Sequence, residues 1–218
     1  MAKKAIIAGA SGLIGSSLLN ILLREPGFDE VLILVRKELS IEHSKLKQLV
    51  VDFDKLSAYS SSITGDVIFS CLGSTRKKTP DLTIYRKIDH DYPLEIANIG
   101  KQNGIKQYHL VSSMGANAAS SNFYTKMKGE IEDDLKAVGI ESLFIYRPAL
   151  LIGERKERRP LEKTLFVLAK LIDPLLIGSL KKYRSIPAAT VAMAMYKQSL
   201  KKQEGIFIYP SDKITELS

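Results

Sequence analysis

Side chains suited to proton chemistry stand close together in the second half of the chain. Ser112 and Ser113 follow an apolar segment, and Tyr124 comes eleven residues after Ser113, with Lys128 four residues further on. On a helix, positions i and i+4 share one face, so the lysine ammonium would lie beside the tyrosine hydroxyl. A neighbouring cation favours tyrosinate, which allows proton exchange near neutral pH. We therefore predict a centre in which a serine orients a substrate carbonyl and Tyr124 exchanges a proton.

A glycine-rich turn near the N-terminus could bind a dinucleotide. It reads Gly9-Ala10-Ser11-Gly12-Leu13-Ile14-Gly15 and lies between a short apolar strand and a helical pattern. Glycines allow backbone N–H groups to approach a pyrophosphate at the helix N-terminus and allow the helix to pack against the strand. The spacing is GxxGxxG rather than GxGxxG, and a turn without a ligand is the alternative interpretation.

The end of the second predicted strand should discriminate between cofactors. An acidic residue there would bind the adenosine ribose hydroxyls of NAD and repel a 2′-phosphate. This chain instead has Arg36 and Lys37, which offer a planar fork and a point charge to a phosphate. We predict that NADP(H) is preferred over NAD(H); an exposed Arg-Lys pair without a ligand is the alternative.

The elements that position these groups alternate between apolar strands and helical patterns. Continuous apolar strands separated by helices indicate a parallel sheet covered on both faces, and right-handed crossovers favour the doubly wound arrangement. The predicted strands are 5–8, 31–35, 49–51, 67–71, 108–111 and 142–146, and the predicted helices are 13–24, 85–103 and 123–138.

The pattern changes after Pro148, where a basic loop leads to predicted helices 161–180 and 188–202 and a strand, 205–209. We predict one NAD(P)-binding α/β domain over residues 1–218, in which 149–218 form a smaller substrate or cap portion at the carboxyl edge of the sheet. Residues 164–180 are apolar, but their uninterrupted length falls short of the ~20 residues that cross a bilayer. We expect a buried or lid helix there, and peripheral membrane contact is the alternative.

Composition is typical of a globular protein: of 218 residues, 45% are hydrophobic and 26% are charged. Cys71 is the only cysteine, which excludes an internal disulfide, and we expect it to be a small buried hydrophobe. His43, His90 and His109 show no metal-ligand spacing, so no metal site is expected. The N-terminus lacks the pattern of a signal peptide, and a cytoplasmic location is predicted.

The net charge of +8 is concentrated in the last third of the chain. Residues 1–153 hold 19 Lys+Arg against 17 Asp+Glu, whereas residues 154–218 hold 13 against 7. The surplus would suit an anionic partner or would simply be solvated surface. It comes without a zinc finger, an RNP-like aromatic run or a basic helix, so no specific nucleic-acid binding is expected.

Acidic residues on the predicted helices are expected to serve structure. Asp89 and Asp91 are interpreted as N-terminal charges that satisfy a helix dipole. Glu132, Asp133 and Asp134 are interpreted as a solvated helical face.

These motifs together resemble the short-chain dehydrogenase/reductase superfamily, in particular its atypical, extended-like branch. The segments VVDFDKL, CLGSTRKK, VSSMGANAASSNFY, KGEIE and YRPALLIGERKERRPLE are similar to the Tat-interacting protein 30 oxidoreductase-like family, over nearly the whole chain from Lys4 to about Lys202. The chain departs from the superfamily in two ways: an Asn that often precedes the glycine after strand four is absent, and the superfamily's catalytic asparagine is not evident.

The resemblance implies a role for each matching residue. Ser113, in preference to Ser112, would orient the carbonyl, with Tyr124 as proton donor and Lys128 as its partner at the cofactor ribose. The other implied cofactor contacts are Gly9, Ser11, Gly12, Leu13, Ile14 and Gly15 at the pyrophosphate, Arg36 at the 2′-phosphate, Asp52 and Phe53 at the adenine, Cys71, Leu72 and Gly73 at the adenosine ribose, and Arg147, Pro148, Ala149 and Leu150 near the nicotinamide.

Three functions follow as hypotheses. The leading one is an NADPH-dependent reductase of a small carbonyl or enone compound. A sugar-nucleotide epimerase or dehydratase with tightly held NAD would use the same scaffold, but Arg36 and the short C-terminal part speak against it. A non-catalytic NADPH-binding regulator or scaffold is the third, because the resemblance also implies protein partners.

Overall fold

A seven-stranded parallel sheet forms the centre of the molecule. The computed structural model describes residues 3–153, 173 and 176–218. The strand order is β3-β2-β1-β4-β5-β6-β9, which confirms the predicted doubly wound α/β fold. The strands are β1 (Lys4–Ala8), β2 (Glu30–Val35), β3 (Leu46–Val50), β4 (Val67–Ser70), β5 (Gln107–Val111), β6 (Ser142–Arg147) and β9 (Gly205–Pro210).

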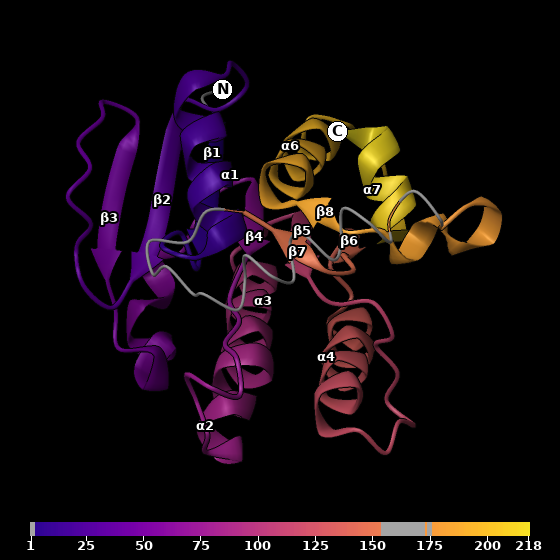
Figure 1. The fold of residues 1–218 in the computed structure, drawn as a ribbon. Helices are drawn as coiled ribbons and strands as arrows, with labels where there is room; N and C mark the ends of the chain where they lie inside the picture. The colour runs from indigo at the N-terminus through magenta and orange to yellow at the C-terminus, as the bar shows by residue number, and fades with distance from the viewer. Residues whose placement is uncertain (1–2, 154–172, 174–175) are drawn as a thin grey trace.

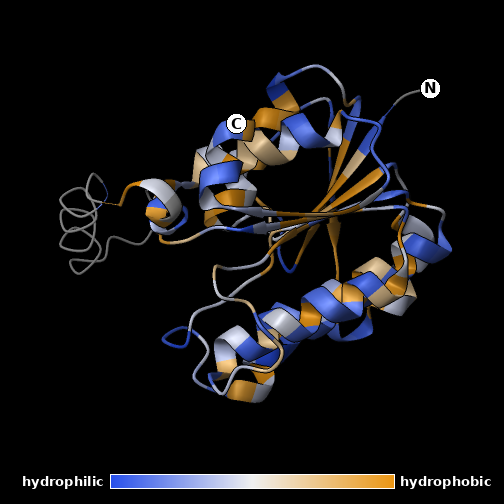
Figure 2. Ribbon diagram, turned by 90° about the vertical axis from the view of Figure 1, so that its right-hand side faces the viewer, coloured by the Kyte–Doolittle hydropathy of each residue, from blue (hydrophilic) through white to orange (hydrophobic). Residues whose placement is uncertain are grey.

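Helices cover both faces of this sheet, and each face has its own apolar core (Figures 1 and 2). On one face, Leu18 and Leu22 of α1 pack with Val191 and Met195 of α6. On the other face, helices α3 and α4 pack against the strands. The helices are α1 (Leu13–Arg24), α2 (Leu82–Arg86), α3 (Tyr92–Gln102), α4 (Phe123–Val138), α6 (Ala188–Ser199) and α7 (Ser211–Leu217).

The strand order sets the position of the functional segments. Strand β1 pairs with β2 on one side and with β4 on the other, and β4 pairs with β5. All these pairs are parallel, so the residues that follow Ala8, Ser70 and Val111 emerge at the same edge of the sheet. This carboxyl edge, where the strand order reverses at β1, is where doubly wound sheets bind ligands.

The segment before α3 differs from the predicted helix 85–103. The helix starts earlier, at Leu82, where the Asp81 carboxylate accepts hydrogen bonds from the Thr83 and Ile84 amides. A π-helical turn, η2 (Lys87–Asp91), joins α2 to α3. One extra residue per turn rotates the side chains that follow, and such turns are frequent at functional sites.

The 3-10 segment η1 (Phe53–Ser62), which has a kink at Lys55, follows β3 and was not predicted. Its N-cap is Asp52, whose carboxylate accepts a hydrogen bond from the Asp54 amide at 3.0 Å. This helix has few apolar residues, so its sequence shows no apolar periodicity that would predict a helix.

The C-terminal portion 149–218 divides between two locations. Strand β9 pairs with β6 and completes the main sheet, and α6 packs against α1. The short strands β7 (Leu151–Ile152) and β8 (Ile186–Pro187) form a separate two-stranded sheet. The predicted helix 161–180 lies largely outside the described residues, whose nearest helical turn is η4 (Gly178–Tyr183). Within the part of the chain that is described, no helix has the length and apolarity needed to cross a membrane.

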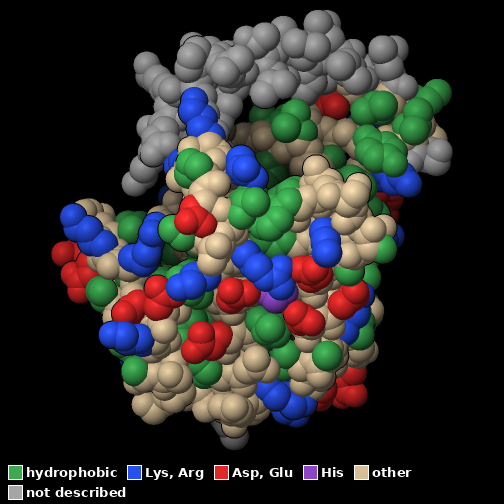
Figure 3. Space-filling view, turned by 90° about the horizontal axis from the view of Figure 1, so that it is seen from below, with side chains coloured by type: hydrophobic (Ala, Val, Ile, Leu, Met, Phe, Trp, Pro, Cys, Tyr) green, Lys and Arg blue, Asp and Glu red, His purple; other side chains and the backbone are tan. Residues whose placement is uncertain are grey.

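Charges of both signs are interspersed on the face formed by the lower ends of helices α2 to α4 (Figure 3). Many of them pair: Arg86 contacts Glu130, and Lys87 contacts Asp54 at 2.7 Å. These exposed or half-exposed pairs connect the helical layer and contribute little stability individually.

Candidate cofactor and catalytic site

The glycine turn closes tightly between β1 and α1. Gly9 has a φ of +88°, and the Gly12 amide donates to the Gly9 carbonyl at 2.9 Å. A Cβ on Gly15 would lie 2.1 Å from the Gly9 oxygen, so the helix can approach the turn only with glycine there. The prediction that this glycine serves close packing of helix and strand is consistent with this geometry.

The start of α1 presents backbone donors at the carboxyl edge of the sheet. Gly12 is the N-cap, no side chain caps the helix, and its first turn holds no acidic residue. The first amides of a helix lack partners within it and carry partial positive charge, which suits a diphosphate. The amides of residues 13–15 therefore fit the pyrophosphate of a dinucleotide.

The predicted adenosine contacts lie on the neighbouring loops. Arg36 and Lys37 are exposed after β2, and no carboxylate occupies the tip of that strand. Phe53 is buried, and its ring centroid is 5.4 Å from that of Tyr92, so its side chain mainly packs in the core. The Asp54 carboxylate accepts hydrogen bonds from Lys87 Nζ at 2.7 Å and Tyr92 Oη at 2.9 Å.

The end of strand β4 lies beside the glycine turn. The Cys71 amide donates to the Ala8 carbonyl at 2.8 Å, and a Cβ on Gly9 would lie 2.6 Å from the Cys71 oxygen. Burial raises the pKa of the Cys71 thiol to about 12. Cys71 packs against the apolar core but is only partly buried, so the predicted buried hydrophobe is confirmed in part. The structure thus brings Cys71 beside the turn, with Leu72 and Gly73 following it.

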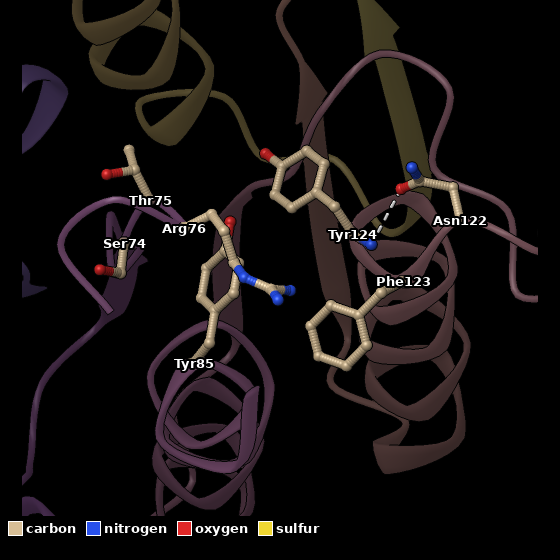
Figure 4. A pocket seen from close by; sticks show the side chains of 7 residues that line it. All are labelled: Ser74, Thr75, Arg76, Tyr85, Asn122, Phe123 and Tyr124. Atoms are coloured by element: carbon tan, nitrogen blue, oxygen red, sulfur yellow. Dashed lines mark hydrogen bonds between the residues drawn. The ribbon is translucent and has the colours of Figure 1, made fainter. Parts of the chain in front are cut away.

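Helix α4 carries Tyr124 and Lys128 as predicted. Asn122 caps the helix, because its side-chain oxygen accepts from the Tyr124 and Thr125 amides at 3.0 and 3.2 Å (Figure 4). At the other end Gly139 adopts a left-handed conformation with φ 70°, which ends the helix. The cap places Tyr124 in the first turn, where 36% of its surface is exposed, and Lys128 one turn deeper.

Lys128 forms a buried ion pair with Asp89 of the π-helical turn. Lys128 Nζ lies 2.9 Å from Asp89 Oδ1, and the two side chains are 4% and 2% exposed. The second carboxylate oxygen of Asp89 accepts the Ser74 amide at 2.7 Å. The interpretation of Asp89 as a helix-dipole charge is therefore wrong: the π turn directs it inward, where it contacts the lysine.

This pair keeps the lysine charged. Burial disfavours the ammonium, but Asp89, Tyr124 and Glu132 outweigh burial and raise the pKa of Lys128 above its ordinary value. A charged amine one helical turn below Tyr124 is what proton transfer through the phenol requires.

The two serines after β5 have different surroundings. Ser112 Oγ donates to Glu132 Oε1, and Glu132 accepts Arg147 Nε at 2.9 Å. Ser113 Oγ is buried and has no hydrogen-bond partner among the described residues. Ser113 is thus the serine whose hydroxyl is not held by another described residue, and the preference for it over Ser112 stays a prediction.

One prediction about this region needs correction. Glu132 was placed on a solvated face, but it is 1% exposed and paired with Arg147. The side chain of Arg147 is held by this pair, and its place near the nicotinamide stays a prediction. Pro148, Ala149 and Leu150 follow β6 at the carboxyl edge, and the Ala149 amide donates to Ser211 Oγ at 2.7 Å.

The two buried histidines, His109 and His90, serve packing. His109 is stacked 4.4 Å from Phe144, and burial lowers its pKa to about 3. His90 contacts Asp91 at 2.8 Å and Asp134 at 3.0 Å, which ties the π turn to α4. Among the described residues no cluster of His, Cys, Asp and Glu could hold a metal ion.

A cavity of about 390 Å³ opens beside Tyr124 (Figure 4). Tyr124 stacks on Tyr85 with ring centroids 6.3 Å apart, and Tyr85 lies 6.0 Å from Phe123. The other residues that line this cavity between α2 and α4 were not predicted as site residues from the sequence: Ser74, Thr75, Arg76, Tyr85, Asn122 and Phe123.

Comparison with known proteins decides the family. A family model described as NAD(P)H-binding matches residues 9–165. Protein HTATIP2 of Rattus norvegicus is 36% identical over 197 residues, which cover 88% of this chain and 79% of that protein. Protein fmp52, mitochondrial, of Aspergillus fumigatus is 36% identical over 221 residues, which cover 98% of this chain and 94% of that protein. The chain belongs to this NAD(P)H-binding family. The resemblance to the Tat-interacting protein 30 family is thereby confirmed.

Solved structures share the fold of this NAD(P)H-binding protein. The Bordetella bronchiseptica enzyme WbmH in complex with NAD+ superposes with a TM-score of 0.72 at 16% identity, covering 99% of this chain and 79% of that chain. UDP-glucose 4-epimerase from Thermotoga maritima superposes with a TM-score of 0.71 at 13% identity, covering 98% of this chain and 80% of that chain. At these identities the likeness extends to the fold alone.

The names of several relatives bear on location. The relatives from Aspergillus fumigatus, Aspergillus clavatus and Candida albicans are each named as mitochondrial proteins. The predicted cytoplasmic location is therefore contradicted.

Proposed function

We propose that this NAD(P)H-binding protein is an NADPH-dependent reductase of a small carbonyl or enone compound. The observation that carries the proposal is the buried Lys128–Asp89 pair beneath Tyr124, with a 2.9 Å separation between Nζ and Oδ1. Burying an ammonium costs free energy, and ion pairs buried close to a half-exposed titratable group are typical of functional sites; proton transfer to a carbonyl oxygen would use this arrangement.

Each residue then has a task. The bound nicotinamide supplies the hydride. Tyr124 donates its proton to the carbonyl oxygen, while Ser113 Oγ, which lacks another partner in the described structure, donates a hydrogen bond that orients the same oxygen. Lys128 stays charged because of Asp89 and stabilises the phenolate that forms, and we expect it to contact the cofactor ribose as well.

Cofactor preference is the first property to test. Arg36 and Lys37 are exposed at the tip of β2 without a carboxylate beside them on that strand, so a 2′-phosphate would be accepted there. A charge-assisted contact to phosphate is worth about 1.5–3 kcal/mol, roughly tenfold to a hundredfold in affinity. Calorimetric titration should show tighter binding of NADPH than of NADH, and Arg36→Ala should lose the difference. Arg24→Ala, at the far end of α1, is the control, and equal affinities for both cofactors would contradict the preference.

Turnover is the second property. Loss of NADPH absorbance is followed with a panel of aldehydes, ketones, enones and quinones, and at least one class should be reduced. If NADPH binds tightly while no class is reduced, a non-catalytic NADPH-binding regulator becomes the better account.

A further inference from the structure

The cavity beside Tyr124 combines aromatic walls with one cationic group. Tyr85, Phe123 and Tyr124 form the walls, and Arg76 also lines the cavity (Figure 4). Its remaining lining residues, Ser74, Thr75 and Asn122, are neutral and polar. The cavity is therefore apolar at the sides, hydrogen-bonding at the rim and positive at one point.

The charge of Arg76 is not neutralised within the described part of the chain. No carboxylate there lies within ion-pair distance of its guanidinium, and none lines the cavity. The nearby acids are committed elsewhere: Asp89 contacts Lys128, and Asp81 caps α2. A ligand carboxylate would thus meet the planar guanidinium of Arg76. A guanidinium donates two parallel hydrogen bonds to a carboxylate.

We propose that this cavity binds an anionic aromatic or conjugated carbonyl compound, with Arg76 as the residue that binds its carboxylate. The inference rests on the proposed reductase function and names its substrate class. A ring of the substrate would pack against the aromatic side chains that line the cavity. Its carbonyl would point to Tyr124 and its carboxylate to Arg76, and the volume of about 390 Å³ suits a compound of this size.

The reaction balances with the groups named. The carbonyl carbon accepts a hydride from NADPH and its oxygen accepts the Tyr124 proton. The aldehyde is thereby reduced to an alcohol and NADPH is oxidised to NADP+, while the carboxylate is unchanged. Solvent then returns a proton to Tyr124.

A matched pair of probes isolates the negative charge. Para-carboxybenzaldehyde and methyl para-formylbenzoate share the ring and the aldehyde and differ in one charge. We expect wild-type protein with NADPH to show a KM at least tenfold lower for the acid, and Arg76→Gln to erase this difference. Arg76→Lys should keep part of it. Lys77→Gln removes a neighbouring charge that does not line the cavity and should leave the preference intact.

A binding measurement separates this inference from the reductase function. Para-(hydroxymethyl)benzoate, the product of the acid, is titrated calorimetrically into protein saturated with NADP+. Binding that weakens about tenfold in Arg76→Gln but not in Lys77→Gln supports the anion site, even if neither aldehyde is reduced and the reductase function fails. If the ester is reduced as efficiently as the acid, or product binding is unchanged in Arg76→Gln, the anion site is refuted while the reductase function stands.

Discussion

The two ends of the site are formed by different chemical groups, backbone amides at one end and charged side chains at the other. At the nucleotide end, the turn from Gly9 to Gly15 offers backbone amides, and the side chain of its Ile14 is buried in the apolar core. At the proton-transfer end, the ion pairs Lys128–Asp89 and Arg147–Glu132 join three elements, η2, α4 and β6, and three of the four side chains are almost fully buried. Geometry is set by local backbone conformation at the first end and by long-range charge pairing at the second.

This difference explains how each end should fail. A backbone cradle tolerates most side-chain changes but is blocked by any group placed over its amides. A buried ion pair contributes modestly when intact but is costly when one partner is removed, because the other charge then has no counterpart. Damage at the first end should therefore abolish cofactor binding and spare the fold, whereas damage at the second should reduce stability.

The largest effect on cofactor binding is expected for Gly12→Val. A Cβ there would lie 3.2 Å from the Gly9 oxygen, and the branched methyls would cover the free amides of α1. Calorimetry should detect no NADPH binding, while the melting temperature stays near that of the wild type. Asn20→Val adds the same side chain to an exposed position of α1 and should leave binding intact. Retained affinity in Gly12→Val would show that the turn is not the phosphate cradle.

Asp89→Asn should give the largest loss of stability. The amide can still accept the Ser74 hydrogen bond but cannot neutralise Lys128, so the free energy of unfolding should fall by about 3–5 kcal/mol near pH 7. Urea unfolding followed by circular dichroism measures this. Asp133→Asn, which breaks the exposed pair with Lys136, should cost far less, and equal losses in the two variants would contradict the account.

The loss should also depend on pH in a defined direction. In the wild type the raised pKa of Lys128 contributes stability at pH values below the unfolded pKa of lysine, about 10.4, and this contribution is lost as pH rises through the folded pKa. In Asp89→Asn, burial dominates and lowers the pKa, so the unfolded state binds more protons and the variant gains stability as pH rises. The difference in free energy of unfolding between the wild type and Asp89→Asn should narrow at alkaline pH. A difference that is constant with pH would contradict this account of Lys128.

The same contrast explains what could be predicted from the sequence. The sheet, the glycine turn and the Tyr124–Lys128 spacing are local patterns, and the structure contains all three. Asp89 was misinterpreted because a π-helical turn shifts it inward, and no propensity marks such a turn. Glu132 looked solvated among its acidic neighbours because its partner Arg147 lies on β6, fifteen residues away. Arg76 has no periodic context, and only the packing of its loop against α2 and α4 brings it to the cavity.

The central claim is that Tyr124 transfers a proton with the help of Lys128, and turnover by Tyr124→Phe with a carbonyl substrate found in the panel tests it most directly. The phenyl ring preserves stacking on Tyr85 and removes only the hydroxyl. We predict an unchanged NADPH affinity and a kcat lower by on the order of a hundredfold or more, since general acid catalysis typically contributes 10²–10⁴-fold. Tyr196→Phe, which removes a hydroxyl bonded to the Pro26 carbonyl far from the site, should keep its kcat. Full reductase activity in Tyr124→Phe would contradict the mechanism.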